Sequence, residues 1–526
     1  MTKKRALRFF NTTGPCNPDK HYMLPHENRL QEAQLHRYIR DELYWVLHAP
    51  RQTGKTTFLQ SWMREINDDG EAVACYVSVE SCRNVPEPER SMPTICAAIR
   101  KHAAQFKLPV PELPQTAPLY MLNDILCDWA ALVAPNPLIV LFDEVDVLID
   151  GTILSFLSQL RDGFASRGIG RFPVSVALVG MRDLKDYITA SKGGVEPNPG
   201  SPFNIKEDSA VLVNFDKTDI ANLFAQRTAE NGQQITQDAL EYVYEQSKGQ
   251  PWIVNSLFKR ATMRILDFES VETVDLKHVV EAREQMIMAR ETHLDALAVR
   301  LKEDRIRSVI EPILIGKSDP DLAEGEAFRF CLDLGLVAVE RGTPVIANPI
   351  YREVIARHLT YGQQLAIPEP DWQWEKPDGS LDMDRMMHEF QIFWRRHADL
   401  WESKSKARSG YTEAFPHLLL MAFLQRVLNG GGHIERDCAA GRGRMDLGIE
   451  YNGYRYIIEI KMIRNYNGPQ TVREEGLEQI RRYRDRFALG APSYLVLFDR
   501  RSKMKRRNWD ERITWEHDGD VTILGC

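Results

Sequence analysis

Short apolar runs separated by longer amphipathic stretches dominate the first half of the chain. Three of the runs carry no Asp, Glu, Lys or Arg, and they lie at 43–48, 138–142 and 174–179. Runs without polar alternation are typical of strands buried on both faces of a parallel sheet. Helical periodicity follows at 58–66, 221–230 and 237–246. The alternation of the two patterns predicts an α/β domain with a parallel sheet.

The middle of the chain has a different pattern. Residues 291–362 read as two helices, two short strands around Arg341-Gly342 and a closing helix. That order predicts a winged helix. A winged helix either binds DNA or acts as an internal lever, and the lever is favoured because the second helix carries no dense basic face.

The turn-rich stretch 363–380 reads as a linker. After it, 381–401 has the pattern of one amphipathic helix, and its aromatic residues are expected in a core rather than on a base-stacking platform. A further apolar helix at 415–428 ends at Gly430-Gly431-Gly432, which suits a helix C-cap.

Asn452-Gly453 lies between two apolar runs, which is the strongest short-range signal for a two-residue β-hairpin. If Tyr451 pairs with Tyr454, pairing outward places Asp446 directly opposite Glu459. Cross-strand carboxylates about 4.5–5.5 Å apart at Cβ repel each other. A divalent cation removes the conflict, because oxygen ligands are those that Mg²⁺ selects. Lys461 follows two residues later, so period-two alternation puts it on the same face.

This constellation resembles the PD-(D/E)XK nuclease superfamily, with Asp446 as the motif aspartate and Glu459-Ile460-Lys461 as the E-x-K. The resemblance implies phosphodiester hydrolysis, in which the metal polarises the phosphate and lowers the pKa of an attacking water. Lys461 would orient that water or stabilise the developing charge. The alternative is a surface hairpin with an ordinary Glu/Lys face.

Further residues extend the resemblance. Glu413 matches the extra metal-binding glutamate that many members place on the helix before the sheet, although complementarity to a helix dipole explains it equally well. Gln479 and Tyr483, at i and i+4 of one helix face, resemble the Q-x-x-x-Y element of the exonuclease-like branch. Gly441-Arg442-Gly443-Arg444 just before Asp446 suits phosphate contact.

The region after the hairpin is the only concentrated basic part of an acidic chain. It fits a phosphate-backbone footprint, with a solvated face as the alternative. Its members are Arg481, Arg482, Arg484, Arg486, Arg500, Arg501, Lys503, Lys505, Arg506 and Arg507.

The run at 43–48 leads into a glycine loop and then a helix, the context that a P-loop needs. Backbone N–H groups would cradle phosphates, Lys55 would reach the β/γ-phosphates, and Thr56 would bind Mg²⁺. The first position departs from the usual motif, since Ala49 replaces glycine. The nucleotide-binding candidates are Ala49, Pro50, Arg51, Gln52, Thr53, Gly54, Lys55, Thr56 and Thr57.

The run at 138–142 ends in Asp143-Glu144 and looks like a Walker B element. Asp143 would hold Mg²⁺ and Glu144 would polarise the attacking water. Asp146 is expected to be a solvated loop acid. Arg182, just after the run at 174–179, is the candidate γ-phosphate sensor, with a plain surface arginine as the alternative.

Gly249-Gln250-Pro251-Trp252 resembles the G-x-P element of signal-transducing AAA-like ATPases, in which the proline packs near the adenine. The alternative is that these residues only end one helix and begin the next. Residues 1–290 resemble an AAA-like or archaeal-type ATPase of the broad STAND group. The whole chain resembles a broad bacterial family of AAA-like proteins that carry a C-terminal nuclease domain, through the segments at 201–204, 249–252 and 429–432.

Composition adds few constraints. The chain has 526 residues, net charge −7 and 43% hydrophobic residues, as in an ordinary globular protein. Its eight scattered cysteines suggest neither a disulfide framework nor a zinc ribbon. Because neither a signal peptide nor a membrane-spanning run is legible, a cytoplasmic protein without membrane contact is expected.

The expected architecture is an AAA-like P-loop NTPase with a helical lid and winged helix, followed by an α/β restriction-endonuclease-like domain. The expected division is 1–212 (ATPase core), 213–290 (lid), 291–362 (winged helix), 363–380 (linker) and 381–526 (nuclease-like).

The expected function is an ATP-controlled, Mg²⁺-dependent nuclease acting on DNA in phage defence, mobile-element or repair work, with Mn²⁺ as an alternative metal at the nuclease site. The alternative is an ATP-dependent switch or scaffold whose C-terminal domain binds nucleic acid or a partner without cleaving it. RNA stays open as a substrate, and a homo-oligomer is inferred from the resemblance.

Overall fold

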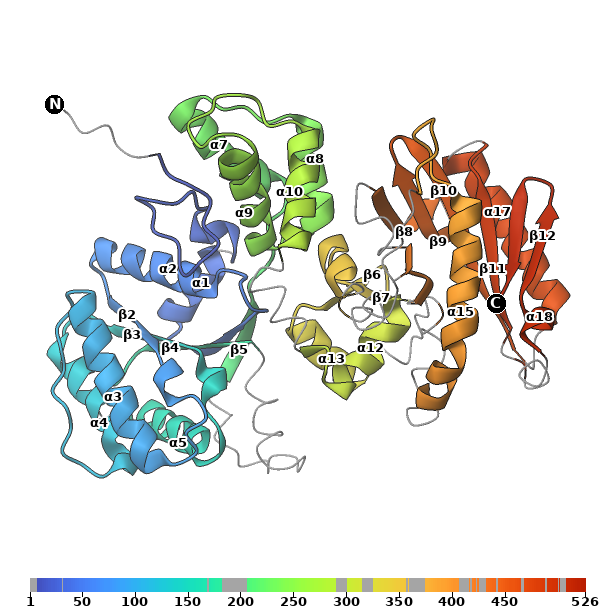
Figure 1. Cartoon of the computed structure of the whole chain (residues 1–526). Helices are drawn as coiled ribbons and strands as arrows, with labels where there is room; N and C mark the ends of the chain where they lie inside the picture. Colours follow the sequence, from blue (N-terminus) through green and yellow to red (C-terminus); the bar gives the residue numbers. More distant parts are fainter. Residues whose placement is uncertain are drawn as a thin grey trace. The chain divides into compact units, whose positions relative to one another are not determined.

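The computed structural model divides the chain into two compact units (Figure 1). The first contains residues 1–291, 329–338 and 347–350, and the second contains 292–328, 339–346 and 351–526. The described residues are 7–30, 32–167, 170–181, 206–289, 300–314, 325–355, 358, 374–405, 416, 419–421, 423–424, 432–440, 443–464, 468–487, 490–499, 501 and 508–526.

In the described part of the first unit, five parallel strands form one sheet in the order β2-β3-β4-β1-β5. The strands are β1 (Tyr44–His48), β2 (Val73–Ser78), β3 (Leu138–Asp143), β4 (Ser175–Gly180) and β5 (Lys206–Val211). Strand β4 therefore lies between β1, which leads into the glycine loop, and β3, which ends in Asp143. The predicted parallel sheet is confirmed.

Helices cover both faces of this sheet (Figure 1). One face packs on α1 (Glu32–Arg40) and α2 (Lys55–Asp69) through Trp45 and Leu47 of β1. The other face packs on three helices through Tyr44 and Val46. These helices are α3 (Pro88–Gln105), α4 (Pro118–Leu132) and α5 (Asp150–Ser166). Burial on both faces explains why β1, β3 and β4 show no polar alternation in the sequence.

Four helices follow β5 and form the lid. They are α7 (Lys217–Asn231), α8 (Gln237–Ser247), α9 (Pro251–Arg260) and α10 (Leu276–Met288). Capping boxes begin α7 at Asp216 and α10 at Asp275, where each side chain accepts a backbone N–H. Short helical turns elsewhere in the unit are η1 (His26–Asn28), η2 (Glu80–Cys82), η3 (Val145–Val147) and η5 (Ala261–Ile265).

The elements of the predicted winged helix occur in the expected order, and the described ones are divided between the two units. They are α12 (Asp304–Leu314), α13 (Glu326–Asp333), β6 (Val337–Glu340) and β7 (Thr343–Ile346). The two strands pair across Arg341-Gly342, both of which have positive φ. The winged-helix assignment itself stays a prediction.

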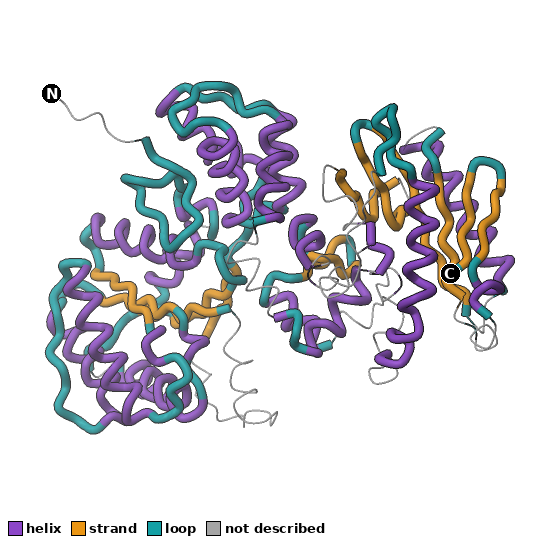
Figure 2. Tube along the Cα trace, viewed as in Figure 1, coloured by secondary structure: helices purple, strands orange, loops and turns teal. Residues whose placement is uncertain are grey.

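The second unit contains a mixed sheet with the order β12-β13-β11-β10-β9-β8 in its described part (Figure 2). The strands are β8 (Gly432–Ala440), β9 (Gly443–Tyr451), β10 (Tyr454–Ile463), β11 (Ser493–Asp499), β12 (Thr514–Asp518) and β13 (Val521–Gly525). Strand β10 pairs antiparallel with β9 and parallel with β11. The helices are α15 (Met383–Ser405), α17 (Pro469–Phe487) and α18 (Trp509–Arg512).

Alternate residues of β10 face different helices. Ile458 and Ile460 pack with Phe390 of α15, whereas Ile457 packs with Ile480 of α17. Odd-numbered positions of β10 therefore belong to the α17 face. The expectation that the aromatic residues of 381–401 form a core is confirmed for Phe390 and for Trp394, which is 7% exposed.

Among the described residues, no helix combines the length and apolarity needed to cross a membrane. The cysteines whose side chains the structure describes are all free thiols.

The junction between β5 and the lid depends on a glycine. Gly249 has φ +74°, and a Cβ there would lie 1.8 Å from the carbonyl oxygen of Phe215. Gly232 has φ +85° but open space around it.

We expect Gly232→Ala to lower the free energy of unfolding by about 1 kcal/mol through backbone strain. Gly249→Ala should lower it by about 2–4 kcal/mol, because overpacking adds to the strain. Chemical denaturation followed by circular dichroism checks this, and equal losses would contradict it.

Candidate nucleotide and nuclease sites

The glycine loop joins β1 to α2 through two residues in left-handed conformations. Gln52 has φ +59° and Gly54, which precedes α2, has φ +86°. Lys55 folds back over the loop, where its Nζ donates to the carbonyl oxygens of Ala49 at 2.6 Å and Pro50 at 2.8 Å. The loop thus presents the N-terminus of α2 and one ammonium group at a single place, which is the arrangement that binds phosphate.

Thr56 of the loop and Asp143 of β3 lie in direct contact. Thr56 Oγ1 donates to Asp143 Oδ2 at 2.7 Å, and the Tyr76 hydroxyl donates to the same oxygen at 3.2 Å. Asp143 is 1% exposed, and burial raises its pKa while the Thr56 hydrogen bond and the Lys55 charge oppose the rise. A hydroxyl and a carboxylate that converge in this way fit a nucleotide-bound Mg²⁺.

Glu144 follows in a left-handed conformation with φ +62°. Ser78, at the end of the neighbouring strand β2, donates its hydroxyl to Glu144 Oε2 at 3.0 Å. Burial, followed by the negative charges of Asp143 and Glu80, raises the pKa of Glu144 to about 7. A carboxylate with that pKa is suited to accept a proton from water near neutral pH. No sequence motif points to Ser78, because it reaches Glu144 only through the pairing of β2 with β3 in the sheet.

Burial also acts on the loop lysine and its acidic neighbours. It lowers the pKa of Lys55 to about 8, and the charges of Asp143 and Asp146 oppose that shift. Asp146 is half-buried against Gly180 at the end of β4, and burial raises its pKa. The expectation that Asp146 is a solvated loop acid is therefore wrong, because the turn after β3 folds back onto the sheet.

Two further side chains hold the loop from outside. The sequence did not indicate Arg29, and it indicated Gln250 only as the middle residue of the G-x-P segment. Arg29 donates through its terminal nitrogen to the Thr53 carbonyl at 2.8 Å and to the Val213 carbonyl at 2.7 Å. Burial lowers the pKa of its guanidinium to about 10. Gln250, just before α9, donates to the Gln52 carbonyl at 3.3 Å. Arg29 and Gln250 therefore link the loop to the residues after β5 and to the lid.

A cavity of about 150 Å³ lies beside the loop. Gly54 and Thr57 form its border toward the phosphate-binding loop, and Pro251 of α9 lies in its wall. The remaining wall is largely apolar and includes Leu24 and Phe215. Pro251 thus lies beside a pocket that borders the loop, and its place near an adenine stays a prediction.

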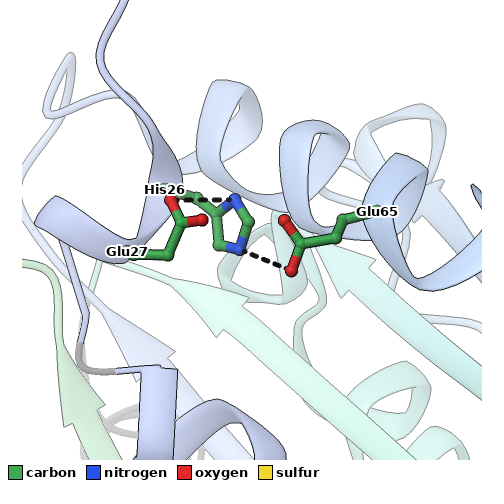
Figure 3. Close-up of side chains that lie close together, drawn as sticks. All are labelled: His26, Glu27 and Glu65. Carbon is green, nitrogen blue, oxygen red and sulfur yellow. Dashed lines mark ion pairs between the residues drawn. The ribbon is translucent and has the colours of Figure 1, made fainter. Parts of the chain in front are cut away.

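His26 lies in the same wall, 4% exposed, between two carboxylates (Figure 3). Its Nδ1 is 3.7 Å from Glu27 Oε2, and its Nε2 is 3.5 Å from Glu65 Oε1. One potential ligand atom from each residue lies within 4.8 Å of the other two. Glu65 belongs to α2, so the three side chains connect η1 to the helix that begins at Lys55.

The predicted hairpin is present in the second unit. Asn452 and Gly453 have φ +47° and +83°, as a type I′ turn requires. Tyr451 pairs with Tyr454, and the register continues to Leu447 and Ile458. One further step would bring position 446 opposite Glu459, one pair beyond those described. The side chain of Asp446 lies outside the described residues.

Glu459 and Lys461 lie on the α17 face of β10. Lys461 Nζ is 2.7 Å from Glu459 Oε1, and the Glu459 side chain is 2% exposed. Helix α17 approaches this face closely at Gly476, where a Cβ would lie 3.3 Å from Lys461 Cγ and 2.6 Å from Leu495 Cδ1. The buried carboxylate supplies oxygen donors of the kind that Mg²⁺ prefers.

Gln479 and Tyr483 lie on α17, as expected. Gln479 Oε1 is buried and has no hydrogen-bond partner among the described residues. Tyr483 is 1% exposed and packs in the core with Ile457 and Leu495. The ring of Tyr483 thus has a packing role, while Gln479 retains an available acceptor beside the face that carries Glu459.

The described arginines of the basic region are engaged in ion pairs. The pairs are Arg481–Asp518 at 2.9 Å, Arg482–Glu478 at 2.7 Å, Arg484–Asp520 at 3.1 Å and Arg501–Asp499 at 2.6 Å. Arg473, which lies earlier on α17 and outside that region, pairs with Glu516 at 2.6 Å. Three of the acidic partners come from the hairpin of β12 and β13. The expected free basic surface is therefore neutralised where the structure describes it.

Several predicted residues lie outside the described residues or have undescribed side chains. They are Arg182, Glu413, Arg442, Arg444, Arg486, Arg500, Lys503, Lys505, Arg506 and Arg507.

Residues 411–496 match the PD-(D/E)XK nuclease superfamily. This segment is a nuclease-superfamily domain. It contains the hairpin, the Glu459–Lys461 pair and all of α17. The chain therefore joins a domain with a five-stranded parallel sheet and a P-loop-like turn to a segment of the nuclease superfamily.

Several solved structures resemble about two thirds of the chain. A Walker-type ATPase of Pyrococcus abyssi is 14% identical, covers 66% of this chain and 99% of its own, and has a TM-score of 0.48. The Thermotoga maritima RuvB Holliday junction branch migration motor is 15% identical, with coverages of 61% and 90% and a TM-score of 0.33.

Cdc6p from Pyrobaculum aerophilum is 15% identical, with coverages of 65% and 95% and a TM-score of 0.37. No curated protein matches the chain. The ATPase assignment rests on the chain's own strand order and loop geometry.

The pKa of Glu144 leads to a pH-dependent prediction. Because its folded-state pKa is raised to about 7, the carboxylate is ionised only above that pH, and we expect ATP hydrolysis to rise between pH 6 and 8. The Ser78 hydrogen bond lowers this pKa and the Glu80 charge raises it. Ser78→Ala should therefore move the profile of kcat to higher pH, and Glu80→Gln to lower pH. A shift of both pH profiles in the same direction would contradict the opposite effects assigned to Ser78 and Glu80 on the pKa of Glu144.

Proposed function

We propose that this protein is an ATP-controlled, Mg²⁺-dependent nuclease that acts on DNA in phage defence, mobile-element or repair work. The observation that carries the proposal is the buried Glu459–Lys461 pair inside a nuclease-superfamily domain. The contact between Thr56 and Asp143 in the same chain supports control by a nucleotide.

At the nucleotide site, the place of each side chain suggests its role. Lys55 and the N–H groups of the loop bind the phosphates, and Thr56 with Asp143 would hold the Mg²⁺. Glu144 accepts the proton of the attacking water. Arg182 is proposed as the sensor of the γ-phosphate. A bound Mg²⁺ would offset negative charge between the phosphates.

At the nuclease site, Asp446 and Glu459 would hold the metal, joined by Glu413. The metal, Mg²⁺ or Mn²⁺, would polarise the scissile phosphate. The Lys461 amine, already placed against Glu459, orients the water or stabilises developing negative charge. Gln479 and Tyr483 position these groups from α17.

Control by ATP requires that nucleotide binding change the arrangement around the nuclease domain. The segment 291–362 connects the lid to that domain, so it is the proposed lever. A homo-oligomer in the cytoplasm, with an arginine supplied by a neighbouring subunit, would complete the ATPase site.

One observation favours a second function, an ATP-dependent switch or scaffold that binds without cleaving. The described arginines of α17 are paired within the domain, which removes the free basic face expected of a nuclease that grips its substrate. Under this function Lys461 and Glu459 form a structural ion pair.

Cleavage assays separate the two functions. We expect purified protein to cut DNA with Mg²⁺ or Mn²⁺ and ATP, and Lys461→Ala to lose at least about 100-fold of that rate while ATP hydrolysis persists. Supercoiled, linear and single-stranded DNA and an RNA are compared by gel electrophoresis. Arg455→Ala is the matched control, because Arg455 is an exposed cation of the same strand that pairs with Glu450.

Lys55→Ala provides the reciprocal test, since it should abolish ATP hydrolysis and with it the ATP dependence of cleavage. Loss of both activities in Lys461→Ala would contradict the two-site proposal. DNA binding without cleavage under every condition would establish the switch or scaffold.

The salt dependence of DNA binding tests whether the arginines of α17 contact phosphates. If they contact phosphates, the double variant Arg481→Gln/Arg484→Gln should weaken DNA binding and reduce the slope of log Kd against log salt by about 1 per arginine. Asp518→Asn/Asp520→Asn should tighten binding, because the arginines lose their internal partners. An unchanged slope in both variants would identify α17 as a solvated, internally paired face.

A further inference from the structure

One cluster of ionisable side chains in the first unit has no part in either proposed site. It consists of His26 and Glu27 of η1 and Glu65 of α2 (Figure 3). His26 is 4% exposed. Its Nε2 atom and the Oε2 atom of Glu27 are buried, and neither has a hydrogen-bond partner among the described residues. The fold therefore buries two potential ligand atoms without pairing them.

The distances between these atoms are too long for hydrogen bonds and suit a shared ion. His26 Nε2 lies 3.5 Å from Glu65 Oε1, and His26 Nδ1 lies 3.7 Å from Glu27 Oε2. An N–H···O hydrogen bond spans about 2.7–3.2 Å. A nitrogen and an oxygen bonded to one zinc ion at about 2.0–2.2 Å in tetrahedral geometry lie about 3.4 Å apart. The separation between Nε2 and Oε1 therefore matches two ligands of one ion.

Glu27 supplies the third ligand. One potential ligand atom from each of the three residues lies within 4.8 Å of the other two. The side chains of Glu27 and Glu65 are 37% and 38% exposed, so both can turn toward an ion, and water can reach a fourth position. Zinc accepts three protein ligands together with one water.

We propose that His26, Glu27 and Glu65 together bind a divalent transition-metal ion of the zinc class, separate from the Mg²⁺ of the two proposed sites. An imidazole nitrogen favours zinc and its neighbours, whereas Mg²⁺ selects oxygen ligands. The ion joins η1 to α2. Arg29, the residue after η1, donates to the Thr53 carbonyl, so the ion fastens a segment that holds the glycine loop.

A proton on His26 is the competing way to satisfy the cluster. An imidazolium between the two carboxylates would need no metal, and added zinc would then change neither binding nor stability. The two arrangements are therefore distinguished by adding Zn²⁺ to the full-length protein.

The protein is first stripped of metal with a chelator, and excess Mg²⁺ is then supplied so that sites built from oxygen ligands are filled. We expect Zn²⁺ to bind and, at about 100 times its Kd, to raise the midpoint of thermal unfolding, because it binds the folded state. Glu65→Gln and Glu27→Gln should each weaken Zn²⁺ binding at least about 10-fold, since loss of a ligand costs no less than loss of an outer-shell partner. Calorimetric titration and thermal denaturation measure the two effects.

Asp68→Asn is the matched control. Asp68 is an exposed acid of the same helix and lies outside the cluster, so its variant removes the same charge and should bind Zn²⁺ like the unaltered protein. His26→Gln removes the buried ligand and should also weaken binding. If that variant does not fold, the two variants of the partly exposed glutamates decide the proposal.

Three results would overturn the proposal. They are absence of Zn²⁺ binding by the unaltered protein, unchanged affinity in Glu65→Gln, and equal weakening in Asp68→Asn, which would show a general effect of charge. The first of these would leave an imidazolium between two carboxylates as the state of the cluster. The inference does not depend on the proposed function, because no reading in this test involves a nucleotide or DNA.

Discussion

A carboxylate buried in an apolar strand needs a positive or hydrogen-bonding partner, and both sites of this chain are organised around that need. Asp143 and Glu459 are each 1% exposed. The first receives a hydroxyl from Thr56 and lies near the Lys55 charge, and the second receives the Lys461 ammonium. Buried charge without such partners is strongly destabilising. The strands, loops and helices around each acid therefore supply donors that also suit a metal-bound phosphate.

The two sites satisfy this constraint by different geometry. In the parallel sheet, the partners of Asp143 come from the ends of neighbouring strands and from the loop after β1, which are distant in sequence. In the nuclease domain, Glu459 and Lys461 are two residues apart on one strand, and a tight turn brings β9 alongside. The close approach of α17 at Gly476 then covers the pair and limits its contact with water.

This difference explains what the sequence could predict. The hairpin register is local, so Asn452-Gly453 sufficed to place β9 against β10, and the buried runs sufficed for β1, β3 and β4. Ser78 and Arg29 carry no local pattern, because contacts between segments distant in the sequence bring them to the site. Likewise, Arg473, Arg481 and Arg484 of α17 are paired with acids 36–43 residues away, which a count of basic residues cannot reveal.

The paired arginines constrain how DNA would reach the nuclease domain. Exposed ion pairs contribute only about 0–1 kcal/mol each, so phosphate groups can replace the carboxylates of the β12–β13 hairpin at small cost. Before contact, however, the neutralised face exerts little attraction over distance, and the chain as a whole carries a net charge of −7. The described arginines of α17 therefore add little long-range attraction for DNA. Under the proposed function, another part of the protein would bring the substrate to Glu459 and Lys461, and the ATPase core is the proposed part.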